Sequence, residues 1–343
     1  MLRVIGPSGG TGTVHDGGGH PERPARIDAV MAGVAEVART LGSDFELLPA
    51  AAADPAALSR VHAPAYLQRL EEFCRSGGGK LDLDTFARPD SWQAALLSAG
   101  AGLQAVDVLR RSGEGTAFVA TRPPGHHALA EHSMGFCLLN NIAVSAAALV
   151  EAGERVLVVD WDVHHGNGTQ ALFWDDPSVL YVSTHQAPLY PGTRAADEVG
   201  GAGARGLTVN VPLPAGATGD VVRRALDEVA GPVIEDFGPT WVLVSAGFDA
   251  HRADPLAGLA LSSGDFAALA RMVAGYAPRP GRLVLFLEGG YDLAALQESV
   301  AATLGALAGV PRTDSTEAPT SGGAGEEAVH AAAQARRQAL ARP

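Results

Sequence analysis

The sequence predicts an α/β protein with a mostly parallel central β-sheet flanked by helices, and three observations support this fold class. Short β-rich runs alternate with patterns of helical period over most of the 343 residues. Four of six such runs are almost wholly apolar, which is typical of parallel strands covered on both faces. Polar residues gather directly after several runs, as expected where strand ends deliver reactive groups to one sheet edge.

The predicted strands are rich in apolar and β-branched residues, and they are residues 117–120, 156–159, 179–182, 207–211, 241–244 and 283–287. Helical patterns fit between them. Apolar side chains recur at helical spacing from Ile27 to Leu41, and Gly42 is a natural stop. Asp220 is expected to cap a further helix. The other predicted helices cover residues 91–111, 141–151 and 293–307.

One compositional break divides the chain. Residues 311–326 are rich in Ser, Thr, Gly, Pro and acidic side chains, which is typical of a linker, and residues 328–341 form an Ala/Arg/Gln-rich helical pattern. We therefore predict one catalytic domain over residues 1–310, followed by a linker and C-terminal helical tail over residues 311–343. Loops over residues 81–90 and 186–206 are expected to build the rim of a site.

Composition narrows the class of partner. The net charge is −13 and no basic stripe is visible, so direct nucleic-acid binding is not expected, while a basic substrate is compatible with the acidic balance. The glycine-rich start shows no signal peptide, and no apolar run is long enough for a membrane span. Two cysteines, Cys74 and Cys137, form no disulfide framework. We expect a cytoplasmic protein with no membrane partner.

The sequence predicts a metal site from three residues that follow two strands. Asp162 and His164 are two apart, so in extended backbone both side chains point the same way, and Asp249 follows another strand. Two carboxylates and an imidazole, with a position left for water, form a catalytic arrangement that suits Zn²⁺, although Fe²⁺ or Co²⁺ could occupy it.

Proton-transfer groups are predicted beside this metal. His126 and His127 follow two prolines and a glycine, and metal-assisted hydrolysis needs one group to take a proton and another to protonate the leaving amine. Asp160 and Asn167 are candidates to orient the two histidines, the carboxylate favouring an imidazolium on its partner. Tyr291 follows Gly289-Gly290 and is a candidate to polarise a carbonyl.

Together these segments resemble the histone deacetylase superfamily, closest to its class II and bacterial deacetylase-like branch, over roughly residues 12–310. The shared motifs are His20-Pro-Glu-Arg-Pro-Ala-Arg26, Arg122-Pro-Pro-Gly-His-His-Ala128, Met134-Gly-Phe-Cys-Leu-Leu-Asn-Asn141, Asp160-Trp-Asp-Val-His-His-Gly-Asn-Gly-Thr-Gln170, Tyr190-Pro-Gly-Thr193, Ala246-Gly-Phe-Asp-Ala-His-Arg-Ala-Asp-Pro-Leu256 and Leu287-Glu-Gly-Gly-Tyr-Asp-Leu293.

The resemblance implies an arginase/deacetylase fold and a zinc-dependent amidohydrolase that acts on an acetylated lysine side chain or a small acetylated amine. In that reading Asp162, His164 and Asp249 hold Zn²⁺, His126 and His127 transfer protons, and Tyr291 polarises the acetyl carbonyl. It further implies a tunnel walled by Gly135, Phe136, Tyr190 and Leu256. It also implies a structural K⁺ or Na⁺ with ligands among Asp160, Asp162, His164, Ser183 and Thr184, and a second such ion near Phe173, Asp176 and Val179.

The sequence departs from the family pattern at several positions. The first strand and loop, residues 1–19, are short and glycine-rich, and Arg194 replaces a usual glycine. Asn167 stands where the class I branch has aspartate, which places the chain outside that branch. Tyr291 stands where weakly active class IIa enzymes have histidine, so deacetylase activity is expected.

Three other functions remain alternatives. Acetylpolyamine hydrolysis would use the same site; Leu256 stands where a glutamate that recognises polyamines would lie, but the rim acids Asp84, Asp90 and Asp197 could serve instead. Binuclear ureohydrolysis needs bridging ligands where this chain has Gly166 and His251. A binding module without turnover would lack a proton-transfer group or the tyrosine. Bacterial relatives suggest a homodimer or homotetramer, which the composition does not fix.

Overall fold

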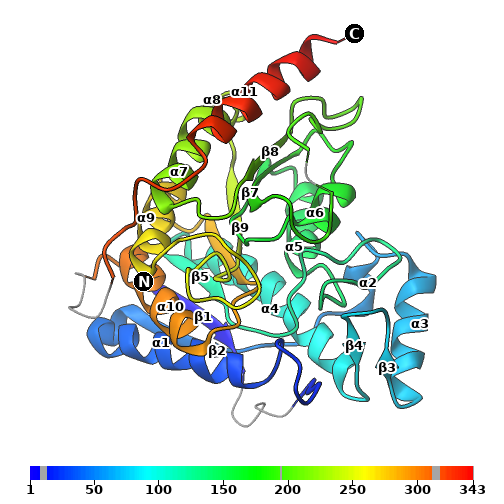
Figure 1. The fold of residues 1–343 in the computed structure, drawn as a ribbon. Coiled ribbons are helices and arrows are strands. Elements are labelled where there is room, and N and C mark those ends of the chain that lie inside the picture. Colours follow the sequence, from blue (N-terminus) through cyan, green and yellow to red (C-terminus); the bar gives the residue numbers. More distant parts are fainter. Residues whose placement is uncertain (8–13, 194, 311–316, 343) are drawn as a thin grey trace.

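The computed structural model describes residues 1–7, 14–193, 195–310 and 317–342. Its centre is an eight-stranded sheet in the order β2-β1-β5-β10-β9-β6-β7-β8, and every neighbouring pair is parallel (Figure 1). The strands are β1 (Leu2–Gly6), β2 (Phe45–Pro49), β5 (Thr116–Val119), β6 (Val156–Asp160), β7 (Val179–Gln186), β8 (Thr208–Leu213), β9 (Trp241–Ala246) and β10 (Leu283–Leu287).

All six strands predicted from apolar runs are confirmed, as is the predicted α/β class. Two strands of the sheet were not among the predicted runs: β1, which only the family resemblance placed within residues 1–19, and β2. The β2 segment Phe-Glu-Leu-Leu-Pro lies at the sheet edge and is half-buried or exposed at every position. Its single proline and charged residue are compatible only with an edge strand, and they mask the apolar pattern. A separate antiparallel pair is formed by β3 (Gly79–Lys80), just before the predicted 81–90 loop, and β4 (Phe86–Ala87), inside that loop.

Helices cover both faces of the sheet, and successive strand residues alternate between them. Leu157 and Val159 of β6 face one core with α1 and α7 to α11, whereas Val156 and Val158 face the other core with α4 and α5. The helices are α1 (Ala25–Leu41), α2 (Pro55–Leu58), α3 (Pro64–Arg75), α4 (Ser91–Ser112), α5 (Asn141–Glu151), α6 (Asn167–Leu172), α7 (Gly219–Arg224), α8 (Gly231–Phe237), α9 (Ser263–Ala274), α10 (Leu293–Leu307) and α11 (Glu326–Ala341), with a 3₁₀ turn at Gly42–Asp44 and a π-helical turn at Ala225–Ala230 between α7 and α8.

The expected cap at Asp220 is wrong by two residues. Thr218, in extended backbone, precedes α7, which begins at Gly219. Asp220 already lies in the first helical turn, where its carboxylate accepts the N–H of Val221 at 2.9 Å. An acidic side chain is favoured both at the cap and in the first turn, so its presence located the helix start only approximately.

The C-terminal region is packed against the domain. The predicted tail helix begins at Glu326, two residues earlier than expected, and α11 contacts the edge strand β8 (Figure 1). Of the predicted linker, residues 311–316 lie outside the described residues, and residues 317–325 make hydrogen bonds to α7 and α9. No helix in the described part of the chain is long and apolar enough to cross a membrane. The division at residue 310 stays a prediction.

Candidate metal and catalytic site

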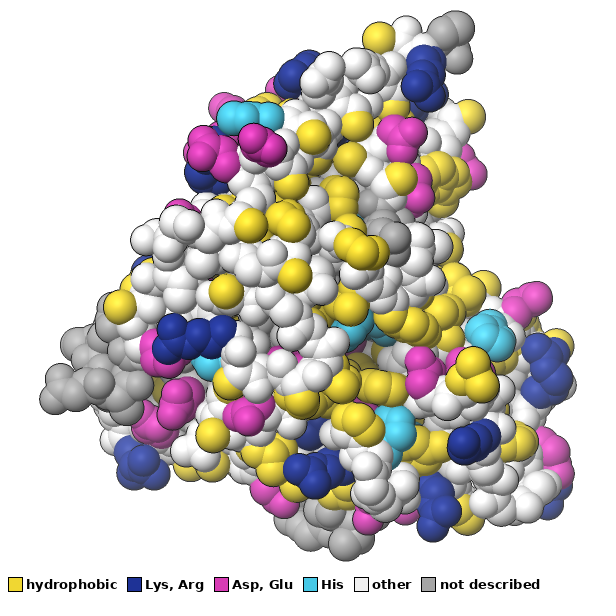
Figure 2. Space-filling view, viewed as in Figure 1, with side chains coloured by type: hydrophobic (Ala, Val, Ile, Leu, Met, Phe, Trp, Pro, Cys, Tyr) yellow, Lys and Arg dark blue, Asp and Glu magenta, His cyan; other side chains and the backbone are white. Residues whose placement is uncertain are grey.

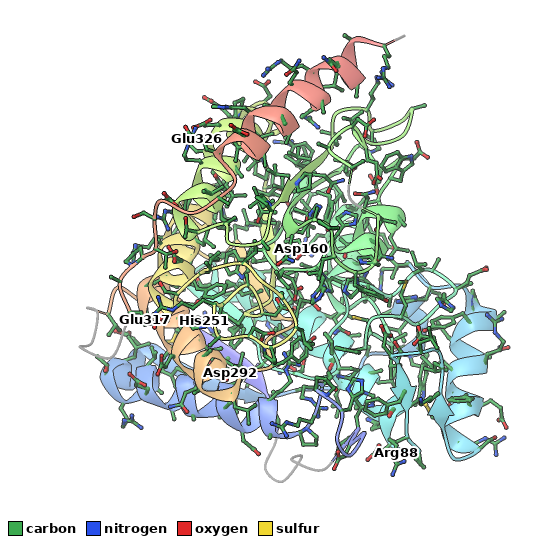
Figure 3. All side chains as sticks on the ribbon, in the orientation of Figure 1. Arg88, Asp160, His251, Asp292, Glu317 and Glu326 are labelled. Carbon is green, nitrogen blue, oxygen red and sulfur yellow. The ribbon has the colours of Figure 1, made fainter. Side chains whose placement is uncertain are left out.

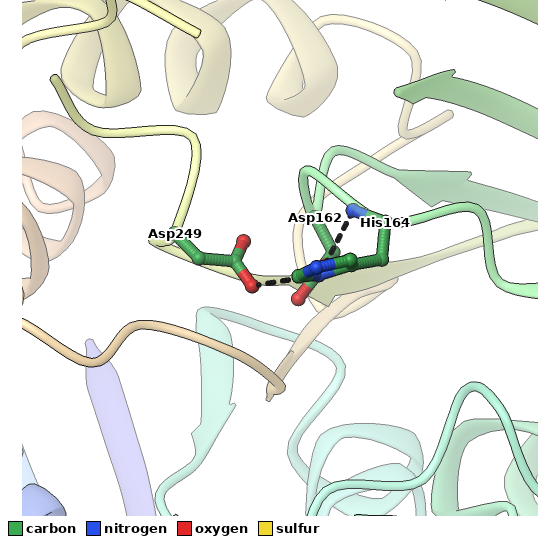
Figure 4. Close-up of side chains that lie close together, drawn as sticks. All are labelled: Asp162, His164 and Asp249. Atoms are coloured by element: carbon green, nitrogen blue, oxygen red, sulfur yellow. Dashed lines mark hydrogen bonds and ion pairs between the residues drawn. The ribbon is translucent and has the colours of Figure 1, made fainter. Parts of the chain in front are cut away.

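The three predicted metal ligands meet at one edge of the sheet. Asp162 and His164 follow β6 and Asp249 follows β9, and these strands are neighbours in register. His164 Nδ1 lies 3.2 Å from Asp162 Oδ1 and 3.2 Å from Asp249 Oδ2 (Figure 4). One ligand atom from each residue falls within a group no wider than 4.8 Å. The parallel sheet therefore assembles residues that are 87 positions apart at most in the sequence.

Backbone amides and glycines hold the two carboxylates in place. Gly289 N donates to Asp162 Oδ2 at 2.8 Å, and Val163 N donates to Asp249 Oδ1 at 3.0 Å. A Cβ at Gly247 would lie 2.1 Å from Asp162 Oδ2, and one at Gly289 would lie 2.0 Å from Asp249 Oδ2. Only glycine allows this close approach, so these turns are fitted to the carboxylates.

The charges of this group fit a divalent cation. Burial, together with the nearby Asp162 carboxylate, raises the pKa of Asp249 to about 7. Burial would lower the pKa of His164, but its hydrogen bonds to Asp162 and Asp249 outweigh burial and raise it to about 10. Two buried carboxylates facing one imidazole attract positive charge, and two oxygens with one nitrogen are a donor set that suits Zn²⁺.

The histidine pair is placed beside the metal ligands, with a different partner for each ring. The ring centroids of His126 and His127 are 4.0 Å apart. His126 Nδ1 lies 3.0 Å from Asp160 Oδ2, and His127 Nδ1 lies 2.8 Å from Asn167 Oδ1. The sequence predicted that Asp160 and Asn167 orient the two histidines, and the structure pairs Asp160 with His126 and Asn167 with His127.

The partners give the two histidines opposite pKa shifts. Burial opposes a charge on both rings. At His126 the carboxylates of Asp160 and Asp162 outweigh burial and raise the pKa to about 10. At His127 burial is reinforced by the neighbouring His126 and His164, which hold its pKa well below the usual value. The pair can therefore hold one charged imidazolium and one neutral base.

A cavity of about 220 Å³ leads to these groups and brings together every predicted wall residue. Gly135, Phe136, Tyr190 and Leu256 line it, as do His126, His127, His164 and Tyr291. Phe136 adopts a positive φ of 68°, an uncommon conformation for a bulky residue, and its N–H donates to Thr85 Oγ1 at 3.0 Å. Figure 2 shows histidine side chains among hydrophobic groups on the face viewed in Figure 1.

Tyr291 is held from three directions. The Arg26 guanidinium lies 4.9 Å from the centre of its ring, and Phe136 contacts it edge-on with ring centroids 5.7 Å apart. Its N–H donates to Asp254 Oδ2 at 2.7 Å. Burial raises the pKa of the Tyr291 hydroxyl well above its usual value, so this group is a hydrogen-bond donor at neutral pH.

The other predicted site residues are the expected ligands of a monovalent cation and the acidic residues of the rim. Ser183 of β7 is the register partner of Asp160, which brings these expected ligands of a monovalent cation together; Thr184 is the next residue of the strand. Among the predicted rim acids, Asp84 lines the cavity, whereas Asp90 Oδ1 accepts the N–H of His15 at 3.1 Å. Arg194 lies outside the described residues.

Sequence reasoning gave no role to several residues that support the site. Glu288 is buried, and its Oε2 accepts the N–H of Gly125 at 2.7 Å and that of His126 at 3.2 Å. Buried Glu22 pairs with Arg26 and Arg122, and Arg26 Nε donates to Gly290 O at 2.7 Å. These charged residues stand in the motifs, but the sequence does not show that they are buried. Their burial, which the fold reveals, is what indicates their role.

Comparisons with known proteins agree with this geometry. A family model described as the histone deacetylase domain matches residues 20–307. Histone deacetylase 10, chloroplastic, from Oryza sativa subsp. japonica is 41% identical over 321 residues, covering 87% of this chain and 71% of the relative. A histone deacetylase-like amidohydrolase from Pseudomonas aeruginosa is 40% identical over 275 residues, covering 79% and 72%. The crystal structure of the HDA15 HD domain superposes with a TM-score of 0.87 at 34% identity, covering 98% and 95% of the two chains.

Proposed function

The chain belongs to the histone deacetylase family, and from this premise we propose that it hydrolyses the N-acetyl amide of an acetylated lysine side chain or a related acetylated amine, using Zn²⁺. The observation that carries the proposal is the Asp162, His164 and Asp249 group at the base of a cavity that also holds a histidine pair and a tyrosine. Bound Zn²⁺ would supply Lewis-acid polarisation of the acetyl carbonyl and a lowered pKa for water.

The chain's own residues divide the proton transfers. Neutral His127, kept neutral by burial and by the neighbouring His126 and His164, takes a proton at Nε2 from the attacking water. His126, charged through Asp160, adds positive charge beside the developing oxyanion. A histidine of this pair, His126 or His127, then gives a proton to the nitrogen of the leaving amine. Asp160 and Asn167 thus set which histidine is acid and which is base.

Tyr291 and the cavity wall orient the substrate. The protonated Tyr291 hydroxyl donates a hydrogen bond to the acetyl carbonyl oxygen, whose negative charge grows in the transition state. The rings of Phe136 and Tyr190 contact the aliphatic chain of the substrate and exclude water from it. Ser183 and Thr184, with the residues that follow β6, would bind a structural K⁺ or Na⁺ that fixes the metal-bearing turn.

Acetylpolyamine hydrolysis is a second candidate because Asp84 lines the same cavity. A carboxylate there would attract the distal ammonium of a polyamine as well as a basic peptide. Leu256, also in the cavity wall, supplies no charge, which favours the acetyl-lysine substrate.

The test is deacetylation by protein stripped of metal and reloaded with Zn²⁺, with acetyl-lysine peptide and acetylpolyamine substrates in parallel. We expect Zn²⁺-dependent turnover of the peptide, abolished in Asp249→Ala together with metal binding. Tyr291→Phe should keep the metal and lose about 10²–10³ in kcat, as is usual for removal of one oxyanion donor. Tyr276→Phe, at the end of α9, is the matched control and should retain full rate.

Three outcomes would change the proposal. Faster turnover of the acetylpolyamine would favour the second candidate. Turnover without metal would contradict the role of the Asp-His-Asp group. Stoichiometric Zn²⁺ binding with neither substrate consumed would point to another acyl group.

A further inference from the structure

Residues 317–325, called here the strap, lie beyond the segment that the family model matches and before α11. The strap runs along the first turns of α7 and α9. A Cβ at Gly264 would lie only 2.2 Å from Glu317 O, so the strap and α9 are in close contact. The hydrogen bonds between the strap and α9 include Glu317 N to Ser263 Oγ at 3.1 Å, Ser262 Oγ to Ala318 O at 2.8 Å, Thr320 N to Asp265 Oδ2 at 3.0 Å, and Thr320 Oγ1 to Asp265 Oδ2 at 2.7 Å.

The first residue of the strap reaches the turn that carries a metal ligand. Glu317 Oε2 lies 3.2 Å from His251 Nε2, and the two side chains are neighbours in Figure 3. His251 is buried, with 5% of its side chain exposed. Its Nδ1 accepts the N–H of Ala253 at 3.1 Å, so the ring proton is on Nε2 and is donated to the carboxylate. Glu317 also pairs with the half-exposed Arg252.

This turn supports two sides of the active site. It begins at Asp249, two residues before His251, and it continues to Asp254, whose N–H donates to His251 O at 2.9 Å. Asp254 Oδ1 accepts the N–H of Leu256 at 3.0 Å, and its Oδ2 accepts the N–H of Tyr291 at 2.7 Å. A displacement of His251 would therefore be felt at the metal ligand, at the tyrosine and at the cavity wall.

We infer that Glu317 is a positioning residue for the metal site, through which the strap fixes the turn from Asp249 to Asp254. Without the Glu317 carboxylate, the Nε2 proton of His251 would be a buried donor with no acceptor. The imidazole would then turn toward another partner and pull the turn with it. The inference rests on the proposed metal site, but not on the identity of the substrate.

The test measures metal binding by the full chain, without turnover. Glu317→Ala should raise the Zn²⁺ dissociation constant about tenfold in competition with a chelator, as removal of a residue that orients a metal ligand does. It should also change the ligand-field absorption of the Co²⁺-loaded protein. Glu317→Gln keeps an acceptor for His251 and should restore both readouts to wild-type values.

Two controls separate this role from strap docking in general. Arg252→Ala removes the exposed ion pair and leaves the His251 contact, and Thr320→Val removes the strap contacts of Oγ1 to Asp265 and Gly219. Both should leave Zn²⁺ affinity and the Co²⁺ spectrum unchanged, although Thr320→Val should lower the melting temperature. If Glu317→Ala does not fold, Glu317→Asp takes its place in the test. Its side chain is shorter by one methylene, so a smaller change in Zn²⁺ affinity and in the Co²⁺ spectrum is expected.

Wild-type affinity and spectrum in a folded Glu317→Ala, or in Glu317→Asp if that variant is needed, would overturn the inference. Equal loss of affinity in Thr320→Val would also overturn it, since general loosening would then suffice. Wild-type protein that bound no Zn²⁺ would instead contradict the proposed function itself, and that result is read before any variant is compared.

Discussion

His126 and His127 are adjacent in the chain, yet they differ in the charge of the oxygen atom that each ring contacts. Asp160 offers an anionic oxygen to His126, and Asn167 offers a neutral one to His127. Because both rings are buried, the charge of the partner decides which ring carries a proton. The difference in charge between the two partners could be read from the sequence, since Asp160 and Asn167 are in the same motif. Which histidine each one contacts depends on the turn before α6, and the sequence did not show this.

Asn167→Asp tests this division of roles. A carboxylate in place of the amide stabilises the imidazolium of His127, so the pKa of His127 should rise. The base is lost as pH falls through that pKa, and the acid limb of kcat/KM should therefore move up by about one unit or more. A pH profile of the Zn²⁺-loaded variant against wild type measures it. Asn167→Ala should slow the reaction without an upward shift; a limb that moved down would contradict the assignment.

At the scale of elements, the site depends on how closely three turns approach one another. The turn after β10 and the turns after β6 and β9 come within hydrogen-bond distance because Gly289 and Gly247 have no side chain. Both glycines were visible in the motifs. The sequence could not show which groups the glycines approach, because the carboxylates of Asp162 and Asp249 follow other strands.

Gly289→Ala should damage the metal site more than the fold. Its Cβ would lie 2.0 Å from Asp249 Oδ2 and 2.7 Å from Asp162 Oδ2, so the carboxylates must separate. We expect a loss of at least about tenfold in Zn²⁺ affinity and about 1–3 kcal/mol in the free energy of unfolding. Chelator competition and denaturant titration measure the two. Gly19→Ala, where a Cβ would meet nothing within 4 Å, is the control; Zn²⁺ affinity equal to that of the control would refute the expectation.

The elements themselves were predictable where burial makes the pattern clear. Helices α5 and α10 end where the sequence placed them, and the six apolar strands were recognised, because central strands and amphipathic helices carry strong periodic signals. Helices α2, α3, α6 and α9 were not predicted, and neither β1 nor the half-exposed β2 was among the predicted apolar runs. Helices α2 and α6 are short, but α3 and α9 have 12 residues each and are at least as long as the recognised α5, so length does not explain why they were missed.

At the scale of the whole molecule, an open parallel sheet leaves two edge strands, and the chain covers one of them itself. Strand β8 is the last in the sheet order, and α11 packs on it. The buried Arg336 of α11 donates to the carbonyls of Gly206 and Thr208, and Arg205 donates to Ala339 O at 2.7 Å. The sequence predicted a C-terminal helical tail but not its position, because nothing in its composition indicates which edge it would cover.

Arg336→Ala should release α11 and expose the β8 edge. The guanidinium is 7% exposed, and burial lowers its pKa to about 10, so its hydrogen bonds to the two carbonyls are made away from water. Losing such charged hydrogen bonds costs about 1.5–3 kcal/mol, and the uncovered carbonyls become a template for strand pairing between copies. We expect a lower melting temperature and a larger mass in light scattering after gel filtration, with Zn²⁺ affinity retained because Glu317 and the strap remain docked.

Arg337→Ala, on the exposed side of the same helix, is the matched control and should change neither quantity. A variant with the mass and melting temperature of the control would show that α11 is held by its apolar contacts alone, with Val329 and Ala332 in the core, and that the edge needs no arginine to stay covered.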